Sequence, residues 1–132
     1  MLLLIDVGNT STTYGFYRQG RIREVKHVKT SVFPAKLRQL TDNRDSIPFN
    51  HAVISSVVPN LTLKIRKAIK GSKGPKLWVL GQNLPLQIKH KYKDINKLGK
   101  DRLSNIFAAM KLYKPPILIL DFGTAITCDL IS

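Results

Sequence analysis

Two segments of the chain repeat one pattern, and this repeat limits the possible folds more than any other feature of the sequence. Each copy begins with an apolar run, continues through an aspartate, one further residue and a glycine, and carries hydroxyl side chains after it: MLLLIDVGNT at 1–10 and ILILDFGTAIT at 117–127. Continuous apolar runs bounded by turn residues are typical of buried strands. The chain is therefore predicted to contain two strand-to-turn units of the same kind.

The turn after the first strand suits a phosphate that is held together with a metal ion. Gly8 permits a tight turn and a close approach of backbone N–H groups to an anion. The carboxylate of Asp6 would repel a phosphate directly, but it can hold water around a Mg²⁺ that bridges phosphate oxygens. A polar turn without a ligand is the alternative for one copy alone. Two copies favour two lobes that close on one polyphosphate.

Strands and helices are predicted in the segment that separates the two copies. Gln19-Gly20 separates two stretches of alternating character, which predicts a hairpin. In helix 61–70 we expect Leu61, Ile65, Ala68 and Ile69 on one face. The remaining expectations are a helix at 31–40, strands at 51–58, 76–80 and 126–132, loops at 43–49 and 81–98, a glycine-rich break at 70–76, and a helix at 100–113 whose core residues are Leu103, Ile106, Phe107 and Met110.

The composition is that of an ordinary soluble domain. Hydrophobic residues make up 43% and charged residues 23% of 132 residues, which argues against disordered and low-complexity classes. No apolar run reaches the roughly 18 to 20 residues that span a bilayer, and MLLLI is too short for a signal-peptide core. We therefore expect a cytoplasmic protein without a membrane partner. The single cysteine, Cys128, is expected to be a small buried residue.

The net charge is the unusual part of the composition. The chain carries 22 Lys and Arg against 8 Asp and Glu, a formal net charge of +14, which attracts polyanions. Nucleic acid is one candidate partner. The basic residues are spread along the chain, however, without the aromatic stacking platforms of single-strand binders, so nucleic-acid binding remains an alternative. Acidic partners in a part of the molecule outside this chain would also explain the imbalance.

The motifs together identify a family resemblance. DVGNT and DFGTAIT resemble the phosphate-binding turns of the actin-like, sugar-kinase and Hsp70 ATPase superfamily. LGKDRL at 98–103 resembles the GxDR substrate motif of type III pantothenate kinases, and SSVVP at 55–59 resembles a strand end of that family. The four motifs follow the order of the family along the whole chain. The resemblance implies an α/β fold: a ribonuclease-H-like (actin-like ATPase) domain with a mixed sheet flanked by helices, plus the first strands of a second similar domain.

The resemblance also implies the roles of individual residues. Asp101 would be the catalytic base, Asp121 would bind a monovalent cation (K⁺ or NH₄⁺), and Asp6 would hold Mg²⁺ through water. Helix capping by Asp101 beside a solvated Arg102 is the alternative reading of that pair. The implied pantothenate contacts are Tyr92, Gly99, Lys100, Asp101 and Arg102. The implied ATP phosphate contacts are Asp6, Val7, Gly8, Asn9, Thr10, Ser11, Thr12, Thr13 and Thr124.

The sequence departs from the family in its length. Family members are roughly twice as long and form homodimers through a second lobe that completes the nucleotide site. We therefore expect residues 1–114 to form the N-terminal lobe and residues 115–132 to begin a truncated second lobe, with apolar surface exposed over 117–131. Because phosphoryl transfer needs both lobes to hold ATP and the alcohol in line, we expect little or no kinase activity from this chain alone.

The expected function is the ATP-dependent phosphorylation of pantothenate to 4′-phosphopantothenate, the first step of coenzyme A biosynthesis. A catalytically inactive nucleotide-binding or transcriptional accessory module of the same fold is a second hypothesis. A basic nucleic-acid-binding domain is a third. Asp101 and Arg102, which a merely accessory module would not need, favour the kinase. The three histidines, His27, His51 and His90, lack the spacing of metal ligands and receive no role.

Overall fold

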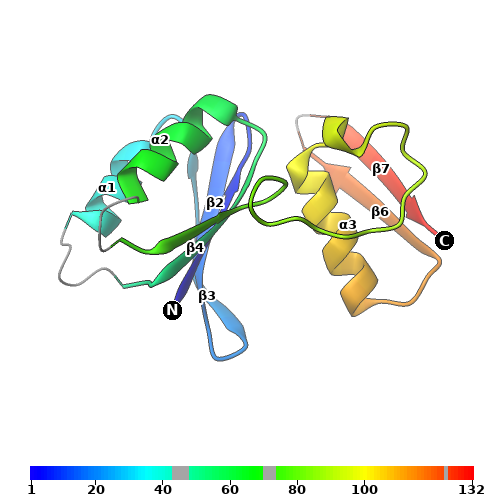
Figure 1. Ribbon diagram of the computed structural model, residues 1–132, viewed down its shortest axis with the longest axis horizontal. Coiled ribbons are helices and arrows are strands. Elements are labelled where there is room, and N and C mark those ends of the chain that lie inside the picture. Colours follow the sequence, from blue (N-terminus) through cyan, green and yellow to red (C-terminus); the bar gives the residue numbers. More distant parts are fainter. Residues whose placement is uncertain (43–47, 70–73, 124) are drawn as a thin grey trace. The chain divides into compact units, whose positions relative to one another are not determined.

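The chain folds into two units, each of which has its own buried core (Figure 1). The computed structural model describes residues 1–42, 48–69, 74–123 and 125–132. The first unit spans Met1–Pro85 and the second Leu86–Ser132. The division lies upstream of the expected lobe boundary at 114/115, because helix α3 (Lys100–Leu112) packs against strands β6 (Ile117–Phe122) and β7 (Ile126–Ile131). The lobe boundary of the complete protein stays a prediction.

Among the described strands, five form one mixed sheet in the first unit, in the order β3-β2-β1-β4-β5. Strand β1 (Leu2–Val7) lies at the centre, parallel to β4 (His51–Ser56), which in turn is parallel to β5 (Lys76–Val79). On its other side β1 is antiparallel to β2 (Ser11–Arg18), and β2 is antiparallel to β3 (Arg21–Lys29). This arrangement confirms the expected α/β class and is consistent with an actin-like ATPase domain.

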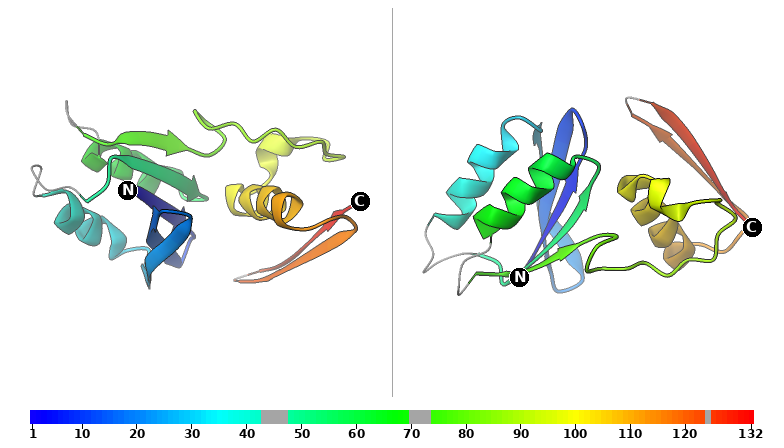
Figure 2. Two further views of the ribbon diagram at one scale, coloured as in Figure 1. Left: turned by 90° about the horizontal axis from the view of Figure 1, so that it is seen from below. Right: turned by 45° about the horizontal axis from the view of Figure 1, so that its top comes forward.

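Helices α1 (Phe33–Thr41) and α2 (Pro59–Ile69) cover one face of this sheet (Figures 1 and 2). Proline in the first turn of α1 is favourable because its fixed φ suits a helix start, where its missing N–H costs nothing. Alternate residues of the strands point toward the helices. The core that results contains Leu3, Ile5, Val7, Tyr14, Phe16, Phe33, Leu37, Phe49, Ala52, Ile54, Leu61, Ile65 and Ile69.

The predicted hairpin between β2 and β3 is confirmed. Gln19 and Gly20 both have positive φ, 51° and 79°, as a two-residue turn that follows the strand twist requires. Every residue of β3 except Val28 is exposed, and four of the nine are Lys or Arg. Charged side chains on an edge strand oppose pairing with another sheet. This supplies a structural reason for part of the basic composition.

The expected face of α2 needs one correction. Leu61, Ile65 and Ile69 are buried as predicted, but Ala68 is exposed, and Thr62 is buried in its place. At 100° per residue, the buried positions fill an arc from Leu61 to Thr62, and Ala68 lies just beyond its margin. The loop predicted at 43–49 and the break predicted at 70–76 lie mostly outside the described residues.

The second unit is built from a loop, a short 3₁₀ turn η2 (Ile95–Lys97), helix α3 and the β6-β7 hairpin. These elements confirm the strand–helix order expected from the sequence. Leu98, Leu103 and Ile106 form the core, with Ile119 and Ile131 packed against it. The prediction that Met110 is a core residue is wrong, because it is 41% exposed, and Phe107 is only half-buried. Within the described residues the hairpin covers only one side of α3.

The β6-β7 hairpin has one inward and one outward face. Its inward residues are half-buried or buried, whereas the outward residues are all apolar and all exposed. The expected exposure of apolar surface over 117–131 is confirmed, but the expectation that Cys128 is buried is wrong, because this residue falls on the outward register. The outward face consists of Leu118, Leu120, Phe122, Ile126, Cys128 and Leu130. None of the helices in the described ranges combines the length and apolar character of a membrane span.

Candidate active site

The first predicted phosphate-binding turn connects β1 to β2. Asp6 lies at the carboxyl end of β1, in register with Thr13 of β2 and Ser55 of β4. Cross-strand partners in register share a face of the sheet. The three polar residues therefore stand in one row on the face opposite the helices, because Val7, the neighbour of Asp6, is buried in the core on the helix side.

Gly8 is required by a close approach of two backbone segments. Its N–H donates a hydrogen bond of 2.9 Å to the Ser11 carbonyl, and a Cβ at this position would lie 2.9 Å from the same oxygen. The turn is also stabilised by Thr30, the residue that follows β3. The Thr30 hydroxyl donates to the Gly8 carbonyl at 2.8 Å and lies 3.1 Å from the hydroxyl of Thr12.

Burial limits how two of the predicted phosphate ligands, Val7 and Thr12, can contact a phosphate. Thr12 is fully buried and Val7 is 1% exposed. The Thr12 hydroxyl, expected as a donor to phosphate, is directed into the turn instead. Both residues can reach a phosphate only through their backbone groups. Asn9, Thr10 and Ser11 are exposed, so their hydroxyl and amide groups remain accessible.

Replacing Gly8 with alanine is expected to destabilise the first unit by about 1–3 kcal/mol, because the new Cβ forces the turn away from the Ser11 carbonyl. Urea unfolding followed by the fluorescence of Trp78, the single tryptophan of the chain, reports on this unit. Asn9→Ala, a change at the exposed neighbouring position, is the matched control. Equal midpoints for the two variants would contradict the steric explanation.

The second predicted turn follows β6, and its description is partial. Asp121 is half-buried on the inward face of β6, and its register partner on β7 is Thr127. Within the described residues the buried Thr127 hydroxyl has no hydrogen-bond partner. Carboxylate and hydroxyl oxygens are the ligands that hard cations prefer, so these residues fit the expected monovalent cation. No group of three or more His, Cys, Asp or Glu gathers in the described ranges. Thr124 lies outside the described residues.

The GKDR motif forms the start of helix α3. Gly99 is the N-cap residue, and Lys100, Asp101 and Arg102 form the first turn. Asp101 Oδ1 accepts the backbone N–H of Arg102 at 2.7 Å, so one carboxylate oxygen serves the helix start. In the described residues no hydrogen bond is made to Oδ2. A Cβ at position 99 would collide with Asp101 Oδ1. Glycine at this position therefore leaves room for the carboxylate.

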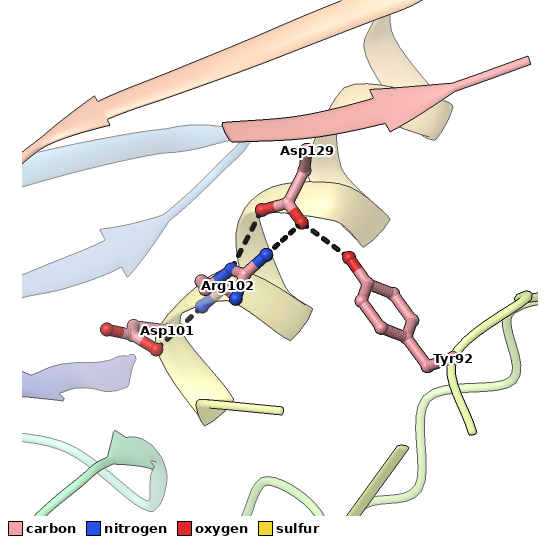
Figure 3. A network of polar contacts seen from close by, with 4 residues as sticks. All are labelled: Tyr92, Asp101, Arg102 and Asp129. Atoms are coloured by element: carbon pink, nitrogen blue, oxygen red, sulfur yellow. Dashed lines mark hydrogen bonds and ion pairs between the residues drawn. The ribbon is translucent and has the colours of Figure 1, made fainter. Parts of the chain in front are cut away.

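Tyr92 and Arg102 meet at a residue that the sequence analysis did not select, Asp129 of β7 (Figure 3). Arg102 Nε donates to Asp129 Oδ2 at 3.0 Å, and Nη2 donates to Oδ1 at 2.5 Å. The Tyr92 hydroxyl donates to the same Oδ1 at 2.5 Å. The carboxylate of Asp129 therefore joins strand β7 to helix α3, through Arg102 27 residues earlier, and to the preceding loop, through Tyr92 37 residues earlier.

The contacts shift the titration of all three groups. Hydrogen bonds from Arg102 hold the pKa of Asp129 below its usual value, against the effect of burial, and the bond from Tyr92 adds to this. The bond to Asp129 raises the pKa of Tyr92, and burial adds to the rise. The same carboxylate raises the pKa of Arg102. Asp129 is therefore ionised, and Tyr92 is neutral, at physiological pH.

The predicted site residues divide between the two units. Residues 6–13 belong to the first unit, whereas Tyr92, residues 99–102 and Asp121 belong to the second. Within the second unit the structure joins Tyr92 to Arg102 through Asp129 and places Asp101 next to Arg102 at the helix start. That the two turns face each other across one triphosphate stays a prediction.

The comparison with protein families matches residues 2–132 to the model described as type III pantothenate kinase. The chain belongs to this family. Relatives that carry the name type III pantothenate kinase come from a Sulfurihydrogenibium species (30% identical), Finegoldia magna (34%) and Persephonella marina (36%), and each alignment covers the whole chain. The chain spans about half of these relatives, between 53% and 56% of their length.

Two residues that the sequence analysis did not select lie beside the predicted site residues. Ser55 stands beside Asp6 in the sheet, and its signal was the SSVVP strand end itself. Asp129 had no such signal. Thr127, Asp129 and Ile131 share the inward face of β7, whereas the opposite, exposed face is entirely apolar, so the pattern of apolar residues favours the wrong face as the buried one.

A cavity of about 590 Å³ in the first unit is not part of the predicted kinase site. It is lined by residues at the amino ends of the parallel strands, such as Leu2 and His51, together with Tyr17 and Trp78. Asp6 lies at the opposite, carboxyl end of β1. In parallel α/β sheets the carboxyl ends of the strands are where ligands usually bind. The position of Asp6 agrees with that rule, and the cavity does not.

Proposed function

We propose that the protein transfers the γ-phosphoryl group of ATP to the primary hydroxyl of pantothenate, giving 4′-phosphopantothenate, the first step of coenzyme A biosynthesis. The observation that carries this proposal is the start of α3, where Asp101 and Arg102 stand together in a chain of the type III pantothenate kinase family. Asp101 accepts the hydroxyl proton as the phosphoryl group arrives. Its Oδ2 is the oxygen that does not serve the helix start.

The ATP phosphates bind along residues 6–13, through the backbone around Gly8 and the exposed polar groups that follow it. Mg²⁺ would be held through water by Asp6, and a monovalent cation, K⁺ or NH₄⁺, by Asp121. These ions supply positive charge that offsets the charge of the transferring phosphoryl group. The kinase is a homodimer in its complete form, and residues 1–132 alone have little or no turnover.

Arg102 acts through hydrogen bonds of fixed geometry rather than as a free cation. Its charge is paired with Asp129, a buried carboxylate, so long-range attraction of an anion is weakened. A guanidinium has five N–H donors, and Asp129 occupies two of them. The remaining donors form hydrogen bonds to the carboxylate of pantothenate. Hydrogen bonding of this kind selects by geometry as well as by charge.

The proposal predicts a specific binding preference for pantothenate. Titration of the 132-residue chain with pantothenate, followed by calorimetry or by NMR shifts of the Arg102 Nε–H group, should show saturable binding. Pantothenol, which has an alcohol in place of the carboxylate, should bind about tenfold or more weakly, because it lacks the anionic acceptor. Equal affinity for the two compounds, or no binding of either, would overturn the proposed substrate site.

Nucleic acid is the less favoured partner for this chain. Four of the 22 basic residues lie on β3, an edge strand where charge opposes sheet association, so part of the basic surface has a structural reason. In the titration above, competition by a short DNA duplex at two salt concentrations separates the two functions, because phosphate-backbone binding weakens steeply with salt. Binding of pantothenate that is unchanged by the duplex supports the kinase.

A further inference from the structure

Asp129 is the one acidic side chain that is buried in the described part of the chain, with 4% of the residue exposed. Burial of an ionised carboxylate is costly unless the charge is paired and its lone pairs are hydrogen-bonded. An apolar residue at this position would avoid that cost. The carboxylate therefore calls for an explanation beyond packing, and its partners supply one, because both of them are residues of the proposed substrate site.

The direction of each hydrogen bond is fixed by the ionisation of Asp129. An ionised carboxylate accepts but cannot donate, so the Tyr92 hydroxyl must give its single proton to Oδ1. The lone pairs of Tyr92 are then what it can offer to a ligand. Arg102, by contrast, cannot accept, and it keeps three of its five donors after two are given to Asp129.

We propose that Asp129 is a positioning residue of the substrate site, which fixes Arg102 as a donor fork and Tyr92 as a hydrogen-bond acceptor. This inference rests on the proposed function. The pair would recognise a ligand that carries an anionic acceptor near an N–H or O–H donor. Pantothenate has both, a carboxylate and, nearby in the same molecule, an amide N–H. Compounds with the carboxylate alone would bind to Arg102 but would give Tyr92 no donor.

The first test is Asp129→Asn in the 132-residue chain. The asparagine side chain keeps the shape but carries no charge and presents an NH₂ group to at least one of the donors, so the hydrogen bonding that holds Arg102 and Tyr92 is weakened. We expect the dissociation constant of pantothenate to rise about tenfold or more. We also expect the pKa of Tyr92 to fall toward its ordinary value, measured by a ¹³Cζ-tyrosine NMR titration. Packing by itself would not change that titration.

A second variant is needed because loss of a buried ion pair can unfold the second unit. Tyr92→Phe removes only the hydroxyl and leaves the Arg102–Asp129 pair in place. We expect pantothenate to bind about three- to tenfold more weakly, the effect of one lost hydrogen bond. Tyr113→Phe, at an exposed position of the same unit outside this network, is the matched control and should bind as the unmodified chain does.

The outcomes separate the two proposals. If the unmodified chain binds pantothenate and a folded Asp129→Asn variant binds it equally well, the positioning role is overturned and the proposed function stands. If Asp129→Asn does not fold, unchanged binding by Tyr92→Phe overturns the acceptor role instead. If the unmodified chain does not bind pantothenate, the proposed function fails. In that case the tyrosine titration still decides whether Asp129 holds Tyr92.

Discussion

Replacement of Asp101 by asparagine is expected to lower kcat by about 10²- to 10⁴-fold in an active kinase assembly that contains this chain. The amide cannot accept the proton of the attacking hydroxyl, whereas its oxygen can still accept the Arg102 N–H that the helix start requires. KM for pantothenate should change little, because the contacts of Arg102 and Tyr92 are untouched. The measurement is the formation of phosphopantothenate, quantified by mass spectrometry.

The matched control for this variant is Asp42→Asn, the same chemical change at an exposed position at the end of α1. It should leave kcat and KM unchanged. If Asp101→Asn keeps turnover within about threefold of the unmodified enzyme, Asp101 is a helix-capping residue and not the base. A large rise in KM with an unchanged kcat would assign Asp101 to substrate binding alone.

Phe33→Ala is expected to destabilise the first unit by about 3–5 kcal/mol. Phe33 is fully buried, and its ring stacks at a tilt against Tyr14, with 5.5 Å between the ring centroids. Its loss leaves a cavity between α1 and the sheet. A cost of this size is a large part of the stability of a small domain. Urea unfolding followed by Trp78 fluorescence measures it, since Trp78 lies on β5 of the same unit.

Val32→Ala is the control for Phe33→Ala, because Val32 precedes it in sequence and is 52% exposed. It should shift the stability by less than about 0.5 kcal/mol. A Phe33→Ala variant as stable as Val32→Ala would show that α1 does not pack on the sheet as described. The two variants therefore test the placement of α1, because one substitution is at a buried residue and the other at an exposed neighbour.

Local patterns were sufficient to predict most elements of the fold. Gln19-Gly20 can adopt positive φ at both positions, so the turn and its hairpin follow from two residues. The apolar spacing of Leu103 and Ile106 likewise identifies the buried side of α3. Each of these signals depends on residues that are neighbours in the chain, which is why sequence alone was enough to find it.

Predictions failed where burial depends on which other element covers a residue. Met110 has the helical spacing of a core position, yet 41% of it is exposed. Cys128 is apolar but lies on the outward register of β7. Thr12 was predicted as an ATP phosphate contact, although its hydroxyl is buried and hydrogen-bonded to that of Thr30. Periodicity predicts which face of a helix or strand is apolar. Whether that face is buried depends on other elements, whose residues are distant in sequence.

The three-way junction at Asp129 ties together positions 92, 102 and 129, which no local pattern connects. A change at any one of them alters the surroundings of the other two, so single substitutions there should not have additive effects. Replacing the arginine or the tyrosine alone leaves the buried acid without one of its hydrogen-bond donors, so combined replacements are expected to be tolerated better than single ones.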